Sequence, residues 1–147
     1  MKSKSKKYHG ERDSAFFRLR SKARLAQLLF SSEEKLSKIA REGGLYKDFQ
    51  KFKKNGRETR TVSAPRADLK AIQSRISDLL MRIMPPDWLF SPVKGRSYVD
   101  NARPHANAAS LRLLDIEDFF PSCTGNKVVW FFKERMECSP DVAVILK

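Results

Sequence analysis

The stretch that decides the fold class is LYKDFQKFKKNGRETRTVS, at residues 45–63. Residues 45–52 alternate loosely and carry strand-forming aromatic side chains, and residues 59–63 are rich in β-branched ones. Asn55-Gly56 lies between the two runs, and this dipeptide favours a tight hairpin turn because both residues tolerate positive φ. We therefore expect a two-stranded β-hairpin over residues 45–63.

Helical patterns lie on both sides of this hairpin. Apolar residues at helical spacing predict a helix that begins at Asp13 or Ser14. Ser31, followed by Glu34, has the spacing of a capping box and predicts the start of a second helix. The most regular amphipathic pattern covers residues 67–84, and the prolines that follow it end the predicted helix.

The last third of the sequence predicts further helices and one strand. A helical piece is expected at 98–106, residues 110–115 alternate like a strand, and a pair of short helices follows. The fold class is therefore α+β, with helices dominating. We divide the chain into a mobile basic lead, a helix-rich region with the hairpin, and a region that begins with the predicted strand: 1–12, 13–106 and 107–147.

Composition limits the class of protein. The 147 residues include 30 Lys and Arg against 17 Asp and Glu, for a formal net charge of +13. This excess makes a polyanion such as nucleic acid the expected partner, although a basic face can also serve solubility alone. No stretch approaches the roughly 18 apolar residues that a membrane-spanning helix needs. Cys123 and Cys138 have no metal-ligand spacing, which favours free thiols and a cytoplasmic location.

Three carboxylates follow the predicted strand, in the order Asp115, Glu117 and Asp118. A carboxylate at the end of a buried strand is held rigidly at the mouth of a sheet. Mg²⁺ is commonly bound by one or two such carboxylates together with water and phosphate oxygens. The backbone carbonyl of Ile116 is a further candidate ligand. The alternative is that these acids are solvated turn formers or helix caps.

Two other groups of polar residues have competing interpretations. The hairpin carries cations that suit a triphosphate or a nucleic-acid backbone: Lys51, Lys53, Lys54, Arg57 and Arg60. The alternative is an exposed hairpin whose lysines protect its edges from aggregation. Asn101 and His105 have no metal ligand near them in the sequence, and such a pair is ordinarily structural.

The order of these motifs resembles the amino-terminal part of a bacterial retron-type reverse transcriptase. The resemblance covers nearly the whole chain, and the element Asn-Ala-x-x-His distinguishes retrons from related polymerases. The stretches that carry it, besides the hairpin, are FFRLRSK at 16–22, LKAIQ at 69–73, KGRS at 94–97, NARPH at 101–105 and LDIEDFFPS at 114–122. The implied architecture is the fingers together with the beginning of the palm.

The resemblance also implies roles for single residues. Asp115 matches the first catalytic, metal-binding aspartate, and Ile116 matches the adjacent carbonyl ligand of Mg²⁺. Phe120 matches the bulky residue that selects deoxynucleotides. The remaining expected contacts with the incoming deoxynucleoside triphosphate are those of Lys53, Arg60, Asp118 and Phe119. The expected contacts with the RNA template and primer, or with the RNA–DNA hybrid, are those of Lys70, Arg75, Lys94 and Arg96.

The sequence departs from the family in one important respect. Retron enzymes carry a second catalytic motif with two adjacent aspartates, and no Asp-Asp pair occurs in these 147 residues. A site with two metal ions about 3.5–4 Å apart needs further carboxylates. We therefore expect a truncated piece that is inactive alone. The resemblance also implies that the complete enzyme takes part in anti-phage defence. The alternatives are a non-catalytic RNA-binding protein and one half of a polymerase split between two chains.

Overall fold

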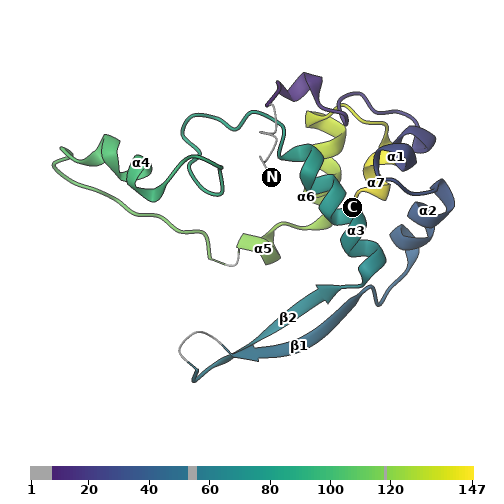
Figure 1. Cartoon of the computed structure of the whole chain (residues 1–147), viewed down its shortest axis with the longest axis horizontal. Helices are drawn as coiled ribbons and strands as arrows, with labels where there is room; N and C mark the ends of the chain where they lie inside the picture. The colour runs from purple at the N-terminus through teal and green to yellow at the C-terminus, as the bar shows by residue number, and fades with distance from the viewer. Residues whose placement is uncertain (1–7, 53–55, 118) are drawn as a thin grey trace, which may run out of the picture.

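The computed structural model describes residues 8–52, 56–117 and 119–147. Its helical body consists of helices from both ends of the chain packed together with α3 from the middle (Figure 1). Their bounds are α1 Lys22–Leu28, α2 Glu33–Arg41, α3 Ala67–Leu80, α6 Gly125–Trp130 and α7 Pro140–Ile145. A π-helical turn at Phe131–Arg135 continues α6, and a 3₁₀ turn at Glu11–Asp13 precedes the first helix.

The hydrophobic core joins the beginning of the described chain to its last helices. The largest fully buried side chains are Phe16, Leu25, Met136 and Val142. The Phe16 ring meets Phe132 edge-on, with 5.4 Å between the ring centroids. The body is therefore closed by contacts between segments more than a hundred residues apart in the sequence.

The first helix begins eight residues later than Ser14, the later of its two predicted starts. Ser21 caps α1 by accepting a hydrogen bond from the Arg24 amide at 3.2 Å. The preceding residues are not helical because their backbone bonds to the end of the chain. The Arg18 amide donates to the Met136 carbonyl at 2.8 Å, and the Ser139 amide donates to the Leu19 carbonyl at 3.0 Å. These distant partners replace the predicted helical hydrogen bonds.

The second predicted helix is confirmed with its start shifted by one residue. Ser32, rather than Ser31, is the N-cap of α2, and its hydroxyl accepts from the Lys35 amide at 3.2 Å. The Ser31 amide instead donates to the Ala26 carbonyl, within the turn that links α1 to α2. The helix ends at Arg41.

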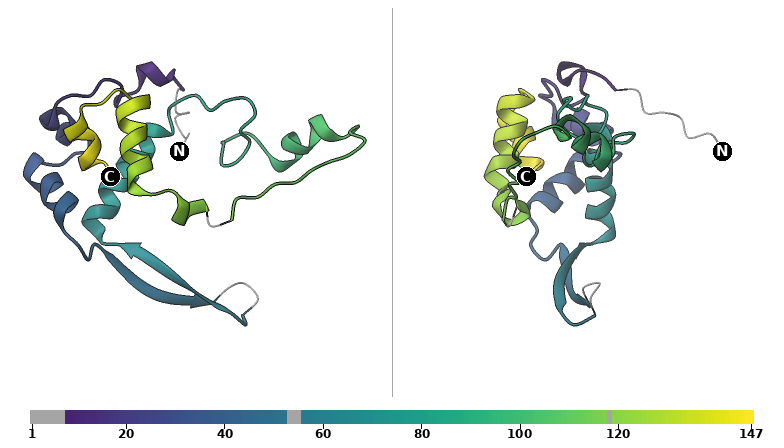
Figure 2. Two further views of the ribbon diagram at one scale, coloured as in Figure 1. Left: turned by 180° about the vertical axis from the view of Figure 1, so that it is seen from behind. Right: turned by 90° about the vertical axis from the view of Figure 1, so that its left-hand side faces the viewer.

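The predicted hairpin is confirmed. Strands β1 (Tyr46–Phe52) and β2 (Thr59–Pro65) pair antiparallel, and this is the only sheet in the described part of the chain. Gly56 has φ +68, as the predicted turn requires. Asn55 lies outside the described residues. Figure 2 shows the hairpin projecting from the helical body.

The basic lead predicted at 1–12 and the helix predicted at 67–84 both differ from the structure, because residue 9 hydrogen-bonds to the backbone just after α3. The His9 amide donates to the Arg82 carbonyl, and the Met84 amide donates to the His9 carbonyl, both at 2.9 Å. These bonds form a short parallel bridge beside the end of α3, which stops at Leu80 instead of residue 84. Residues 8–12 of the predicted mobile lead are therefore held against the body. Residues 1–7 of that lead lie outside the described residues.

Residues 81–117 form an arm that leaves the body after α3 and returns to it (Figure 1). The arm carries α4 (Tyr98–Ala102) and a 3₁₀ turn at Arg103–His105, as the pattern at 98–106 predicts. It ends at the short helix α5 (Phe119–Ser122). Among the described residues, no helix is both long enough and apolar enough to span a membrane.

The strand predicted at 110–115 does not form. These residues have no regular secondary structure, and Leu113 and Leu114 are 94% and 88% exposed. A strand needs a partner for its backbone groups, and the hairpin is a two-stranded sheet that residues 110–115 do not join. The alternation identifies a segment that could pair, but no described segment pairs with it.

Candidate functional site

Asp115 lies on the returning side of the arm, shortly before α5. Its Oδ1 atom accepts a hydrogen bond from the Ile116 amide at 3.0 Å. Asp115 itself is exposed, and the neighbouring Ile116 is 65% exposed. The expectation of a carboxylate held at the mouth of a sheet is therefore not met, because the hairpin is the only sheet among the described residues and Asp115 does not follow one of its strands.

Two aromatic rings follow this carboxylate on α5. The rings of Phe119 and Phe120 meet edge-on with their centroids 5.4 Å apart, and Phe120 is 84% exposed. The Ser122 hydroxyl donates to the Phe119 carbonyl at 2.8 Å, which supports the short helical turn. The turn thus holds Phe120 with its ring presented to solvent a few residues after Asp115.

The register of the hairpin places a lysine beside apolar residues on one of its faces. In the register of the two strands, Lys51 is opposite Arg60 and Phe49 is opposite Val62. Opposite residues in an antiparallel pair lie on the same face of the sheet. Phe49 and Val62 therefore share one face of the hairpin with Lys51.

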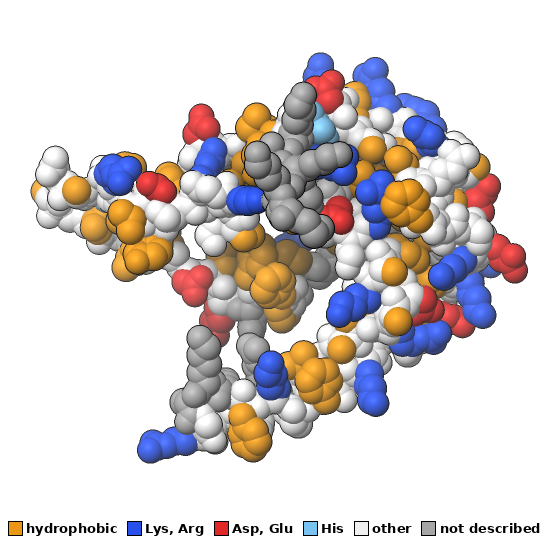
Figure 3. Space-filling model, viewed as in Figure 1, with side chains coloured by type: hydrophobic (Ala, Val, Ile, Leu, Met, Phe, Trp, Pro, Cys, Tyr) orange, Lys and Arg blue, Asp and Glu red, His pale blue; other side chains and the backbone are white. Residues whose placement is uncertain are grey.

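The base of the hairpin is attached to the helical body. The Gln73 amide group on α3 donates to the Tyr46 hydroxyl at 2.7 Å. In Figure 3 the surface is hollowed between the arm above and the hairpin below, and α5 lies beneath the arm in Figure 1. In this view the arm, α5 and the hairpin, which carry most of the predicted site residues, border the same hollow.

Comparison with known proteins identifies the family. The chain is 33% identical over 102 residues to the Retron Se72 reverse transcriptase of Salmonella heidelberg, an alignment covering 69% of this chain. It is 36% identical over 74 residues to the Retron Ec86 reverse transcriptase of Escherichia coli, and 39% identical over 74 residues to the Retron Mx65 reverse transcriptase of Myxococcus xanthus. Over these alignments the chain is similar to the retron reverse transcriptases, a family of RNA-directed DNA polymerases.

These matches cover only part of each relative. The aligned region is 27% of the Se72 enzyme, 23% of the Ec86 enzyme and 16% of the Mx65 enzyme. No family model matches the chain, and no solved structure matches it. The family resemblance expected from the motifs is therefore confirmed by sequence similarity.

The described residues of this chain do not form a metal site by themselves. The described residues contain no group of three or more His, Cys, Asp or Glu side chains that could hold a metal ion. Asp115 and the Ile116 carbonyl remain as candidate ligands, whereas Asp118 lies outside the described residues. Alone, this pair does not fit a metal site, because one exposed carboxylate leaves most of the Mg²⁺ coordination to other groups.

The predicted cations on α3 have different surroundings. Lys70 is exposed, whereas the Arg75 Nε atom donates to the Leu28 carbonyl at 2.9 Å. The Arg75 guanidinium also lies over the Phe30 ring, 4.3 Å from its centroid. The structure thus gives Arg75 a structural contact that sequence analysis did not foresee. Lys53 lies outside the described residues, and Arg60 is placed by its backbone in β2.

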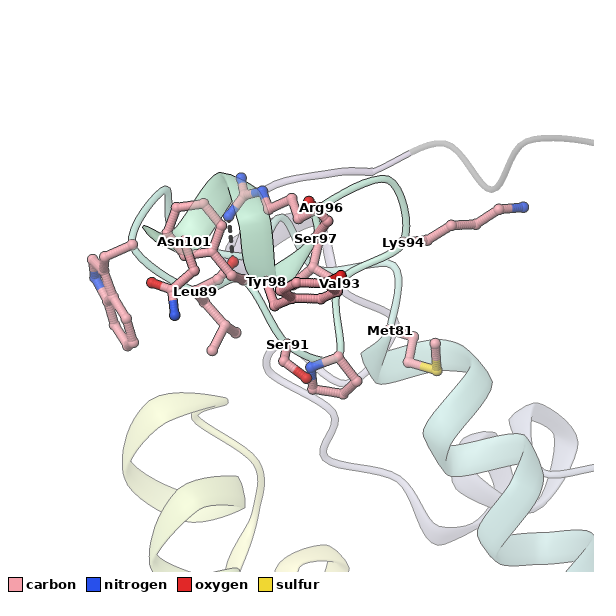
Figure 4. Close-up of a pocket in the computed structure, with 12 residues that line it drawn as sticks. Met81, Leu89, Ser91, Val93, Lys94, Arg96, Ser97, Tyr98 and Asn101 are labelled. Carbon is pink, nitrogen blue, oxygen red and sulfur yellow. Dashed lines mark hydrogen bonds between the residues drawn. The ribbon is translucent and has the colours of Figure 1, made fainter. Parts of the chain in front are cut away.

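Arg96 also makes structural contacts that sequence analysis missed. Its Nη1 atom donates to the carbonyls of Pro86 and Leu89, each at 2.6 Å, and lies 3.3 Å from the Asp87 carbonyl. The contact with Leu89 is drawn in Figure 4. In contrast, Lys94 extends away from the other labelled side chains. The only feature of the sequence that indicated these contacts is Gly95, which predicts a turn before Arg96; in the structure its φ is +86.

Asn101 and His105 lie at the outer end of the arm, in α4 and the 3₁₀ turn after it, and both are exposed. Ser97 and Asp100 form a capping box at the start of α4. The hydrogen bonds from the Ser97 hydroxyl and amide hold the pKa of Asp100 below its ordinary value. The capping box positions α4, so the Asn-Ala-x-x-His motif projects from a defined helical turn.

Proposed function

We propose that this chain provides the fingers and the first metal-binding motif of the palm in an RNA-directed DNA polymerase. The complete enzyme would copy a structured RNA into DNA, using deoxynucleoside triphosphates. The observation that carries the proposal is the match to retron reverse transcriptases across 69% of this chain. The order of hairpin, α3, arm and α5 along that chain supports it.

In this proposal Asp115 and the Ile116 carbonyl contribute two ligands to Mg²⁺. The remaining carboxylates would come from residues outside these 147, because the sequence contains no pair of adjacent aspartates. When bound, Mg²⁺ would neutralise the charge on the transferred phosphate. The exposure of Asp115 supports this role, since the carboxylate is free to meet such partners.

The remaining residues would hold and select the nucleotide. Phe120 would pack under the sugar, where its ring leaves no room for the 2′-hydroxyl of a ribonucleotide. The exposed position of the ring and its edge contact with Phe119 support this role. The contacts proposed for the triphosphate are the cations Lys53 and Arg60 and the backbone amides of Asp118 and Phe119.

Primer extension on an RNA template tests the proposal, in an enzyme completed with the missing palm and thumb. Asp115→Asn keeps the shape of the side chain and removes its charge, so we expect extension to fall to background. Asp13→Asn is the matched control because Asp13 is an exposed carboxylate on the 3₁₀ turn before α1. Full extension by the Asp115 variant contradicts the proposal.

Sugar selection provides a second, independent readout. Phe120→Ala is expected to raise ribonucleotide incorporation relative to deoxynucleotide incorporation, because the shortened side chain leaves space for the 2′-hydroxyl. Phe52→Ala is the control, since Phe52 is also exposed (70%) but lies on the hairpin. Unchanged discrimination in the Phe120 variant contradicts its role at the sugar.

Two features support the alternative of a non-catalytic RNA-binding protein: the missing Asp-Asp pair and the net charge of +13. That alternative predicts salt-dependent RNA binding but no extension with any complementing segment. If a separate chain restores extension, the polymerase is split between two chains. The family resemblance extends the proposal to anti-phage defence, which is tested by phage plating on cells with the complete enzyme or its Asp115→Asn variant.

A further inference from the structure

The arm contains a cavity of about 770 Å³ whose lining is rich in aromatic side chains. Trp88 and Tyr98 line it and are 76% and 86% exposed, and Phe90 is half-buried beside them. Figure 4 shows Tyr98 on the wall formed by the start of α4. Two large rings with so much exposed surface offer flat faces to a planar ligand.

The loop that presents these rings is rigidly held. The Arg96 guanidinium joins the carbonyls of Pro86 and Leu89, which flank Trp88 in the sequence. The capping box of Ser97 fixes the first turn of α4, which begins at Tyr98. The pocket is therefore preorganised, and a ligand would lose little affinity through ordering it.

The charge around the pocket favours an anionic ligand. Asp87 is paired with Arg96 at 3.4 Å, and Asp100 with Arg103 at 3.2 Å. Lys94 is exposed and forms no ion pair with any described residue, and its side chain extends outward in Figure 4. A free cation beside exposed rings matches a ligand that combines phosphate groups with planar bases.

We propose that this aromatic pocket stacks unpaired bases of a single-stranded RNA, with Lys94 contacting the adjacent phosphate. The inference deepens the proposed function, because it identifies a place on the arm where the enzyme would hold its RNA. Base–aromatic stacking tolerates any sequence, since every base has a flat face. The pocket would thus hold unpaired RNA without reading its sequence.

Tryptophan fluorescence tests the stacking directly. The chain contains two tryptophans, so Trp130→Phe leaves Trp88 as the only one. We expect a single-stranded RNA of about twelve nucleotides, within the usual range of binding-site sizes, to quench Trp88 fluorescence. An abasic strand of equal length and charge is the control and should cause little quenching. Equal quenching by both strands overturns the proposal.

Affinity provides the second measurement. Trp88→Ala should weaken binding of the single-stranded RNA by about fivefold to a hundredfold, and it should leave binding of the abasic strand unchanged. Trp88→Phe, which keeps an aromatic face, should retain most of the affinity. Trp130→Ala is the matched control, because Trp130 is 57% exposed on α6, outside the pocket. Equal losses for both strands, or no loss, overturn the proposal.

These results are distinguishable from failure of the proposed function. Stacking is measured by binding, without metal or nucleotide, whereas the polymerase role is measured by primer extension and its dependence on Asp115. If the Trp88→Ala variant binds RNA with normal affinity while primer extension still depends on Asp115, only the stacking proposal is overturned. The stacking proposal is also overturned if the pocket binds a protein and the chain binds the intact and the abasic RNA strands equally well.

Discussion

Replacing Arg75 by methionine separates its observed structural contact from its predicted contact with nucleic acid. The Arg75 Nε atom donates to the carbonyl of Leu28, the last residue of α1, at 2.9 Å. Carbonyls at the end of a helix lack partners within the helix, so this contact satisfies one of them. The guanidinium also lies over the Phe30 ring. Methionine keeps the unbranched stem and loses both interactions.

The expected loss follows from the individual contributions. A hydrogen bond from a charged donor contributes about 1.5–3 kcal/mol. The cation–π contact adds about 0.5 kcal/mol, at the low end because Phe30 is 80% exposed. Since Arg75 is itself only half-buried, water replaces part of the lost hydrogen bond. We therefore expect the free energy of unfolding to fall by about 2 kcal/mol.

Urea unfolding followed by circular dichroism measures this change. The matched control is Lys70→Met, on the same helix, because Lys70 is exposed and its stability effect should stay within about 0.5 kcal/mol. The two variants should behave in the opposite way towards RNA. Loss of a phosphate contact at Lys70 should lower the salt dependence of single-strand binding by about 0.7 in the log–log slope. Arg75→Met should leave that slope unchanged.

Two outcomes would refute this reasoning. One is that Arg75→Met has the same free energy of unfolding as Lys70→Met, which would mean that the contact with Leu28 adds no stability. The other is a reduced salt slope for folded Arg75→Met, which would place the guanidinium on a phosphate. Arg75→Lys adds a check, because it keeps the charge without the planar guanidinium.

The remaining predictions concern the core, one helix cap and the two thiols. Phe16→Ala should lower the free energy of unfolding by about 3–5 kcal/mol, since Phe16 is fully buried, whereas the exposed Phe52→Ala should cost no more than about 1 kcal/mol in thermal or urea unfolding. Hydrogen bonds from the capping serine lower the pKa of Asp100. The stabilisation that they provide is therefore present above the unfolded-state pKa and is lost as the pH falls through the lower folded-state pKa. The NMR signals of α4 should shift below about pH 4 and stay constant above it. Burial raises the pKa of the Cys138 thiol, and Cys123 is exposed, so a thiol reagent should modify one cysteine per folded chain and both in urea.

Local signals in the sequence were sufficient for the elements that are stabilised locally. The hairpin follows from the turn at Gly56 and from alternation within two adjacent runs. Helix α3 follows from the spacing of Leu69, Ile72 and Leu79, which face the core. Such elements form between neighbouring residues, so a pattern within about 20 residues contains most of the information. The motif order likewise identified the family, because it depends only on the order of residues.

Contacts between distant residues decided the rest, and no local pattern records them. Residues 14–20 have a helical pattern, yet Arg18 and Leu19 bond to the backbone of residues 136–139. Arg75 and Arg96 resemble nucleic-acid ligands in sequence, and only the fold reveals the carbonyls that they meet. Residues 110–115 have the alternation of a strand, which determines the face of each side chain but supplies no partner. A backbone or guanidinium hydrogen bond is available to many partners along a chain, and tertiary packing decides which of them comes within 3 Å.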